Sequence, residues 1–84
     1  MSSQNKIKLL MVDDEIKFLE SISKRLVLKN FDVTTASNGK EAIASAEKGL
    51  FDVAVVDFQM PGMDGTQVLK ALKDKHKYLE IIML

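Results

Sequence analysis

Four apolar runs along the chain have the pattern of β-strands. Residues 7–12 and residues 53–56 are almost continuous apolar runs, broken only by Lys8. Such runs predict strands buried on both faces, as in a parallel sheet that helices cover on each side. Residues 31–35 instead alternate in polarity, which predicts a half-exposed strand at an edge of the sheet. Residues 81–84 form a fourth strand, which is again wholly apolar.

Three intervening segments repeat apolar side chains every three or four residues, which is the period of an amphipathic helix. These positions are Ile16, Leu19, Ile22 and Leu26 in the first helix, Ala42, Ile43 and Ala46 in the second, and Val68, Leu69 and Leu72 in the third. The first helix is expected to end near Lys29 and Asn30, because Asn tolerates the left-handed backbone found at helix C-termini. Gly49 ends the second helix, and Asp64 or Thr66 caps the third.

The predicted order of elements is β-α-β-α-β-α-β, which is typical of an α/β fold with a doubly wound parallel sheet. If the alternating strand lies at an edge, right-handed crossovers give the strand order 2-1-3-4. The first and third strands are then neighbours about 4.8 Å apart, and their carboxyl ends meet at the point where the strand order reverses. Open α/β sheets bind their ligands at this point.

Carboxylates follow both of these neighbouring strands. Asp13 and Asp14 come directly after the first strand, and Asp57 comes directly after the third. Two like charges about 4 Å apart repel by about 4 kcal/mol at an effective dielectric near 20, so the cluster is expected to need a cation. Oxygen donors without a nearby His or Cys favour Mg²⁺. The alternative is that Asp13 and Asp14 cap the first helix and Asp57 terminates its strand, but capping explains only one carboxylate at a helix start.

Composition and charge exclude several classes of protein. The chain has 84 residues, enough for at most one domain, and a chain of this length buries only roughly 60% of the surface that it exposes when unfolded. Twelve basic and twelve acidic residues cancel, without a basic stripe, which argues against direct contact with nucleic acid. Residues 1–6 do not have the pattern of a signal peptide, and no apolar run is long enough to span a bilayer. A cytoplasmic protein without membrane contact is therefore expected.

The sequence also lacks motifs of enzymes that bind phosphate. It contains no glycine-rich phosphate loop of the Walker type and no dinucleotide fingerprint. A metal-dependent phosphatase needs a general acid or base beside Asp57, and no candidate is apparent. His76, the only histidine, lies near the end of a lysine-rich helix, where a surface position is expected. The prediction is that the chain is not an enzyme.

At two stretches and one aspartate, the sequence closely resembles the receiver domain of two-component response regulators. They are residues 10–15 (Leu-Met-Val-Asp-Asp-Glu), Asp57, and residues 60–65 (Met-Pro-Gly-Met-Asp-Gly). The resemblance covers essentially all 84 residues, and it implies a flavodoxin-like fold similar to that of chemotaxis regulators. It also implies a role in phosphorelay signal transduction.

The resemblance implies a role for each site residue. Asp57 is the expected phosphoacceptor, a carboxylate nucleophile that takes a phosphoryl group from a histidine kinase or phosphotransfer protein and becomes an aspartyl phosphate. Mg²⁺ is expected to bind Asp14 and Asp57 directly, the backbone carbonyl of Gln59, and Asp13 largely through water. The side chain of Gln59 is expected to lie near the phosphoryl group and to influence how fast water removes it.

The loop after the third strand contains residues that control its backbone conformation. Pro61 fixes its φ angle, and Gly62 and Gly65 allow turn conformations that a side chain would strain. The loop is thereby expected to hold Gln59 over the site before the third helix begins.

The chain departs from the family pattern at its carboxyl end. Residues 1–84 correspond to the N-terminal part of a receiver domain, whereas the family continues with a Ser or Thr, a fourth helix, a fifth strand that ends in a Lys, and a fifth helix. Residues 81–84 are too apolar for an exposed edge, and only the first helix covers one face of the sheet. Self-association through the edge of the fourth strand is therefore expected. The alternative function is a truncated receiver that acts only as an oligomerisation or kinase-docking module, without phospho-switching.

Overall fold

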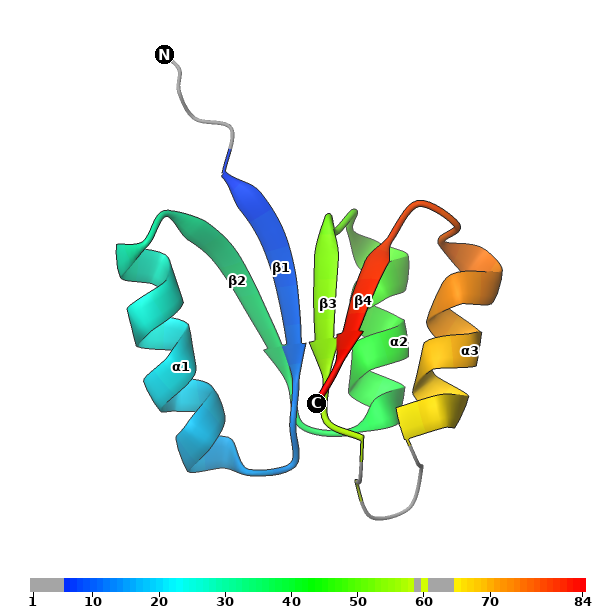
Figure 1. Cartoon of the computed structure of the whole chain (residues 1–84), viewed down its shortest axis with the longest axis horizontal. Coiled ribbons are helices and arrows are strands. Elements are labelled where there is room, and N and C mark those ends of the chain that lie inside the picture. Colours follow the sequence, from blue (N-terminus) through cyan, green and yellow to red (C-terminus); the bar gives the residue numbers. More distant parts are fainter. Residues whose placement is uncertain (1–5, 59, 61–64) are drawn as a thin grey trace.

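Strands and helices alternate along the chain, as the apolar pattern predicts (Figure 1). The structure is a computed structural model that describes residues 6–58, 60 and 65–84. The strands are β1 (Ile7–Val12), β2 (Phe31–Ala36), β3 (Val53–Val56) and β4 (Glu80–Met83), and the helices are α1 (Ile16–Leu28), α2 (Gly39–Lys48) and α3 (Gly65–Lys75). The predicted β-α-β-α-β-α-β order is confirmed.

The four strands form one parallel sheet in the order β2-β1-β3-β4. This is the predicted order, and it places the alternating strand β2 at an edge. In the register of the sheet, Val12 lies beside Ala36 on one side and Val56 on the other. The three strands therefore end at the same level, and the residues that follow β1 and β3 start next to each other.

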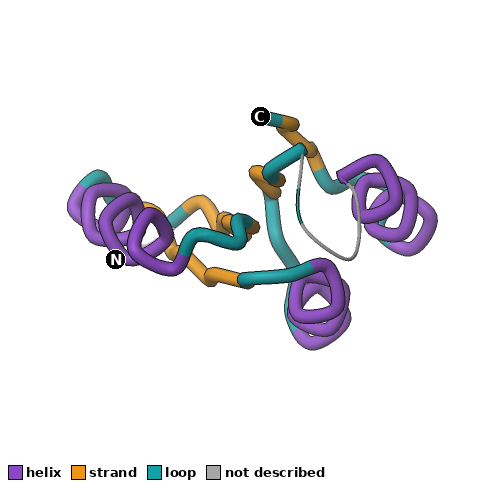
Figure 2. The backbone as a smooth tube through the Cα atoms, turned by 90° about the horizontal axis from the view of Figure 1, so that it is seen from below, coloured by secondary structure: helices purple, strands orange, loops and turns teal. Residues whose placement is uncertain are grey.

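Helices cover both faces of the sheet, with α1 on one face and α2 and α3 on the other (Figure 2). The larger core lies between the sheet and the pair α2 and α3. Its fully buried side chains are Leu10, Val12, Ala36, Ala54 and Val56 from the sheet and Ala42, Val68 and Leu72 from the helices. A smaller core beneath α1 contains Leu9, Met11 and Leu19. Successive side chains of β1 thus point into two separate cores.

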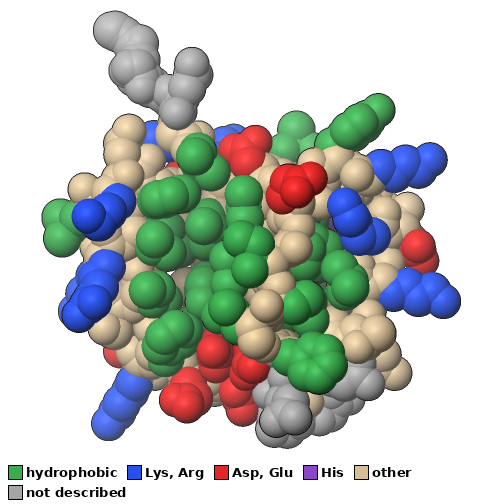
Figure 3. Space-filling model, viewed as in Figure 1, with side chains coloured by type: hydrophobic (Ala, Val, Ile, Leu, Met, Phe, Trp, Pro, Cys, Tyr) green, Lys and Arg blue, Asp and Glu red, His purple; other side chains and the backbone are tan. Residues whose placement is uncertain are grey.

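The face that carries α1 is only partly covered. Because α1 packs mainly against β2 and less against β1, Val53 and Val55 of β3 are half-buried and Ile82 of β4 is 51% exposed. Figure 3 shows the resulting apolar surface over the strands. The prediction that residues 53–56 are buried on both faces is therefore wrong for this face. The predicted bare area of the sheet is confirmed.

Most element ends agree with the sequence. Asn30 follows α1 with a φ of 72°, which is the predicted left-handed conformation, and Gly49 follows α2. β4 begins at Glu80, one residue earlier than predicted. The reason is that the Glu80 amide donates a hydrogen bond to the Asp52 carbonyl (3.2 Å), which extends the pairing of β4 with the chain at β3.

The start of α3 differs from the prediction. The helix begins at Gly65, so Thr66 lies inside its first turn, and the prediction that Thr66 caps the helix is wrong. The Gly65 amide donates to the Phe58 carbonyl (2.9 Å), and this bond brings the chain into the helix before Thr66. Asp64, the other predicted cap, lies outside the described residues.

The helices are short, and each buries one row of side chains against the sheet. Basic residues at the end of α3 connect it to its surroundings. Lys75 forms an ion pair with Glu47 of α2 (2.6 Å), and Lys73 donates to the Leu79 carbonyl (2.8 Å).

Among the described residues, none of the helices combines the length and the apolar character that crossing a membrane requires.

Candidate functional site

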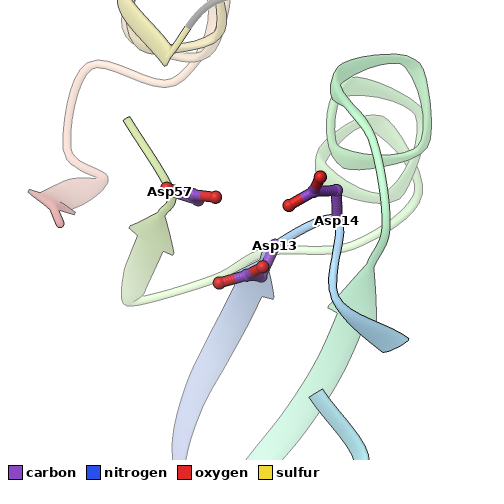
Figure 4. Close-up of side chains that lie close together, drawn as sticks. All are labelled: Asp13, Asp14 and Asp57. Carbon is purple, nitrogen blue, oxygen red and sulfur yellow. The ribbon is translucent and has the colours of Figure 1, made fainter. Parts of the chain in front are cut away.

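Three carboxylates meet at the carboxyl edge of the sheet (Figure 4). Asp13 and Asp14 follow β1 and Asp57 follows β3, and one oxygen atom from each lies within 4.8 Å of the other two. The predicted convergence is confirmed. In the space-filling view, acidic side chains gather at this edge, below the apolar surface of the strands (Figure 3).

Backbone hydrogen bonds beyond the strand ends hold two of these residues in place. The Asp57 amide donates to the Val12 carbonyl (2.9 Å), and the Asp13 amide donates to the Ala36 carbonyl (3.1 Å). Each bond continues a parallel ladder by one residue beyond the strand. The positions of Asp13 and Asp57 therefore follow from the register of the sheet.

The acidic pair does not cap α1. The residue at the N-cap position is Glu15, and its side chain makes no capping hydrogen bond. The Asp13 carboxylate accepts a hydrogen bond from the Glu15 amide (2.9 Å), which stabilises the turn between β1 and α1. The alternative in which Asp13 and Asp14 serve as helix caps is therefore wrong, although Asp13 supports the turn as well as contributing to the cluster.

A second turn supports the site from the side of β2. Ser37 donates to the Glu41 carboxylate from its amide (2.7 Å) and from its hydroxyl (2.9 Å), and the Asn38 side chain accepts from the Glu41 amide (2.9 Å). The amide bond first and then the hydroxyl bond hold the pKa of the Glu41 carboxyl below its usual value. These bonds order the turn after Ala36, whose carbonyl binds the Asp13 amide. This cap was not among the predicted helix ends, although Asn38 followed three residues later by Glu41 is a signal for one.

The charge and the donor atoms of the cluster suit a hard divalent cation. Asp13 and Asp57 are half-buried and Asp14 is exposed. Within the described part of the chain, neither Asp13 nor Asp14 forms an ion pair with a Lys or Arg. Two carboxylates within 4.8 Å of each other repel by about 3.5 kcal/mol or more at an effective dielectric near 20, and a bound cation offsets that cost. Because oxygen atoms are the donors that Mg²⁺ prefers, these residues fit the predicted metal.

The loop predicted to complete the site lies mostly outside the described residues. This applies to Gln59, the predicted metal ligand and modulator of dephosphorylation, and to Pro61 and Gly62. Gly65 is described, and the turn conformation predicted for it is wrong. It is the first residue of α3, and its φ lies outside the left-handed region. A close contact with the backbone of Phe58 requires glycine there instead.

The order of the sheet, the helices on its two faces and the acidic cluster at the switch point together define a flavodoxin-like α/β protein with an acidic site. The family model for the response regulator receiver domain matches residues 9–84. The chain belongs to this family, whose members are the receiver domains of two-component systems.

Individual relatives and solved structures agree with this assignment. The chain is 37% identical over 84 residues to the transcriptional regulatory protein ResD of Bacillus subtilis, a match that covers 100% of this chain and 35% of ResD. It resembles the solved structure of the chemotaxis protein CheY4 of Vibrio cholerae with a TM-score of 0.88 and 38% identity, over 93% of this chain and 67% of CheY4. The response regulator TrrA of Thermotoga maritima, solved in complex with Mg²⁺-BeF, gives a TM-score of 0.85 and 32% identity, over 92% of this chain and 67% of TrrA. The chain thus spans about a third of the length of the curated relatives it matches.

Proposed function

We propose that this chain accepts a phosphoryl group on Asp57 and carries it in a two-component phosphorelay. The observation that carries the proposal is the position of Asp57. The chain belongs to the receiver family, and Asp57 follows the interior strand β3. There it shares the acidic edge of the sheet with Asp13 and Asp14. A carboxylate at such an edge is a nucleophile within reach of a phosphoryl donor. In this proposal the chain is a phosphoryl carrier and not an enzyme.

Mg²⁺ is the proposed cofactor. Asp14 and Asp57 would bind it through their carboxylates, Gln59 through its backbone carbonyl, and Asp13 largely through water. When bound, the cation offsets the repulsion between the carboxylates and the incoming phosphoryl oxygens. The complex of the relative TrrA with Mg²⁺-BeF supports this assignment.

The proposed reaction moves a phosphoryl group between two side chains. A carboxylate oxygen of Asp57 forms a bond to phosphorus while the phosphorus–nitrogen bond of a phosphohistidine on the partner breaks. The imidazole leaves with the electron pair of that bond and takes up a proton, and Asp57 becomes an acyl phosphate. The proposed partner is a cytoplasmic histidine kinase or phosphotransfer protein, which is supported by the solved complex of TrrA with the histidine kinase ThkA.

Intact-mass analysis after incubation with acetyl phosphate and Mg²⁺ tests this proposal. We expect the chain to gain one phosphoryl group, and we expect no gain when EDTA removes the Mg²⁺. The competing function is a receiver that only oligomerises or docks a kinase, without accepting a phosphoryl group. A chain that is folded by circular dichroism but gains no phosphoryl group would favour that alternative and reject the proposal.

Gln59 is proposed to influence the lifetime of the acyl phosphate. Because it stands two residues after Asp57, its side chain would lie near the phosphoryl group and affect the approach of water. We expect Gln59→Ala to change the rate of dephosphorylation several-fold, as followed by the decay of the phosphorylated mass after acetyl phosphate is removed. An unchanged rate would refute this role.

Self-association is proposed for the open face and edge of the sheet. Ile82 and Leu84 are 51% and 62% exposed, and β4 is an edge strand whose outer side has no neighbouring strand among the described residues. Exposed apolar edge strands pair with other chains unless a charge prevents it. We expect light scattering to give a mass of at least two copies, and we expect Ile82→Lys to lower it. A stable, monodisperse monomer of the unchanged chain would contradict this proposal.

A further inference from the structure

The first residue of α3 lies in direct contact with the backbone that follows the acidic site. The Gly65 amide donates to the Phe58 carbonyl (2.9 Å). A Cβ atom added to Gly65 would lie 2.8 Å from both the Cα and the carbonyl oxygen of Phe58, and 2.7 Å from Cε of Met83. Real Cβ atoms essentially never approach other atoms within 3.0 Å, so any side chain here must push atoms apart. Met83 can move its flexible end, but the backbone of Phe58 cannot move independently of its neighbours.

Two backbone hydrogen bonds hold Phe58, and a third holds the residue before it. Its amide donates to the Leu84 carbonyl (3.0 Å), its carbonyl accepts from Gly65, and the preceding residue, Asp57, donates to the Val12 carbonyl (2.9 Å). Consecutive residues are joined by a rigid peptide unit, so a shift of Phe58 is passed to Asp57. The contact with α3 therefore affects the position of the Asp57 carboxylate relative to those that follow β1.

We propose that Gly65 is a positioning residue for the acidic site. Its missing side chain lets α3 close onto Phe58 and sets how far Asp57 lies from Asp13 and Asp14. Ordinary contacts begin at 3.4 Å, so a side chain at a distance of 2.8 Å must displace the backbone by several tenths of an ångström. Binding sites require their groups to be held within about 0.5 Å of the productive geometry. The consequence for Mg²⁺ rests on the proposed function, whereas the displacement of Asp57 does not.

The test compares Gly65→Ala with Gly49→Ala. Gly49 is a suitable control because a Cβ there would meet nothing within 4 Å, and its backbone is extended (φ −147°, ψ 171°). In ¹⁵N-labelled protein, we expect Gly65→Ala to shift the metal-free amide signals of Asp57 and Phe58. We also expect it to raise the Kd for Mg²⁺ by about tenfold or more, the range seen when outer partners of metal ligands are lost. Gly49→Ala should leave the shifts and the Kd unchanged.

The inference would be overturned by a folded Gly65→Ala variant whose Kd for Mg²⁺ and whose metal-free Asp57 amide signal are the same as in the unchanged chain. The double variant Gly65→Ala with Met83→Ala removes the flexible contact but keeps the backbone contact, so we expect its affinity to stay low. Full recovery would assign the effect to Met83 and also overturn the inference. If the unchanged chain does not bind Mg²⁺, the proposed function fails, but the metal-free signals of Asp57 still decide whether Gly65 positions it.

Hydrogen exchange in the unchanged chain covers the case in which Gly65→Ala does not fold. If the contact between α3 and Phe58 is as tight as the structure shows, the Gly65 amide should exchange as slowly as amides in the middle of α3, even though it lies in the first turn. Exchange at the rate of an unprotected amide would overturn the inference, because the helix would then open freely from Phe58.

Discussion

Asp57→Asn is expected to abolish the gain of a phosphoryl group from acetyl phosphate. Asn has nearly the same shape as Asp and keeps the backbone bond from residue 57 to Val12, so the fold should be unchanged. Its neutral amide oxygen is a poor nucleophile, and it cannot form an acyl phosphate. Intact-mass analysis in the presence of Mg²⁺ measures the result directly. Asp74→Asn is the matched control, because Asp74 is an exposed aspartate in α3 outside the acidic cluster.

Asp14→Asn distinguishes the proposed role of a metal ligand from the proposed role of the nucleophile. In the proposed site, Asp14 binds the cation but forms no bond to phosphorus, so its loss should weaken Mg²⁺ binding without removing the acceptor. We expect phosphorylation of this variant to be slow and to recover in part as Mg²⁺ is raised. No concentration of Mg²⁺ should restore Asp57→Asn. A phosphoryl group on Asp57→Asn would show that another residue is the acceptor.

Leu10→Ala is expected to cost about 2–5 kcal/mol in the free energy of unfolding and to leave much of the chain unfolded. Leu10 is 0% exposed in β1, the strand that β2 and β3 flank, and it belongs to the larger core. A small domain has little stability to lose, because it buries only about 60% of the surface of its unfolded chain. Urea unfolding followed by circular dichroism, at several protein concentrations, measures the change.

Leu28→Ala is the control for this loss. It removes the same atoms from a side chain that is 86% exposed at the end of α1, so we expect a change within about 0.5 kcal/mol. If Leu10→Ala and Leu28→Ala unfold at the same urea concentration, the larger core is not packed as the structure shows.

Much of the site was predictable because its determinants are local. A charged side chain is costly to bury, so an apolar run that stops at a carboxylate marks the place where a strand leaves the core. For this reason Asp13 and Asp57 were expected at strand ends, and right-handed crossovers then predicted that those strands are neighbours. The edge position of β2 followed from its alternating side chains. In the loop after β3, Gln59 and residues 61–64 lie outside the described part of the chain, so their predicted contributions remain predictions.

Other features depended on packing between distant segments. The run at residues 53–56 has the same apolar character whether one face or both are covered, so its pattern alone could not show which strands α1 covers. The structure places α1 over β2 and β1 and leaves β3 half-exposed. The need for Gly65 was equally hidden. A glycine at the start of a helix is compatible with a turn, and only the docked helix shows that a Cβ atom at this position would collide with the backbone of Phe58.

The division between local and tertiary information has a physical cause. Apolar periodicity, turn residues and charges act within a few residues of each other, so they were enough to establish the elements, their order and the chemistry of the acidic edge. The coverage of the sheet and the fit of α3 against the residue after Asp57 depend on distances between atoms far apart in the sequence. Those distances are set when the helices pack onto the sheet, and a contact that tolerates only a few tenths of an ångström has no counterpart in the local pattern.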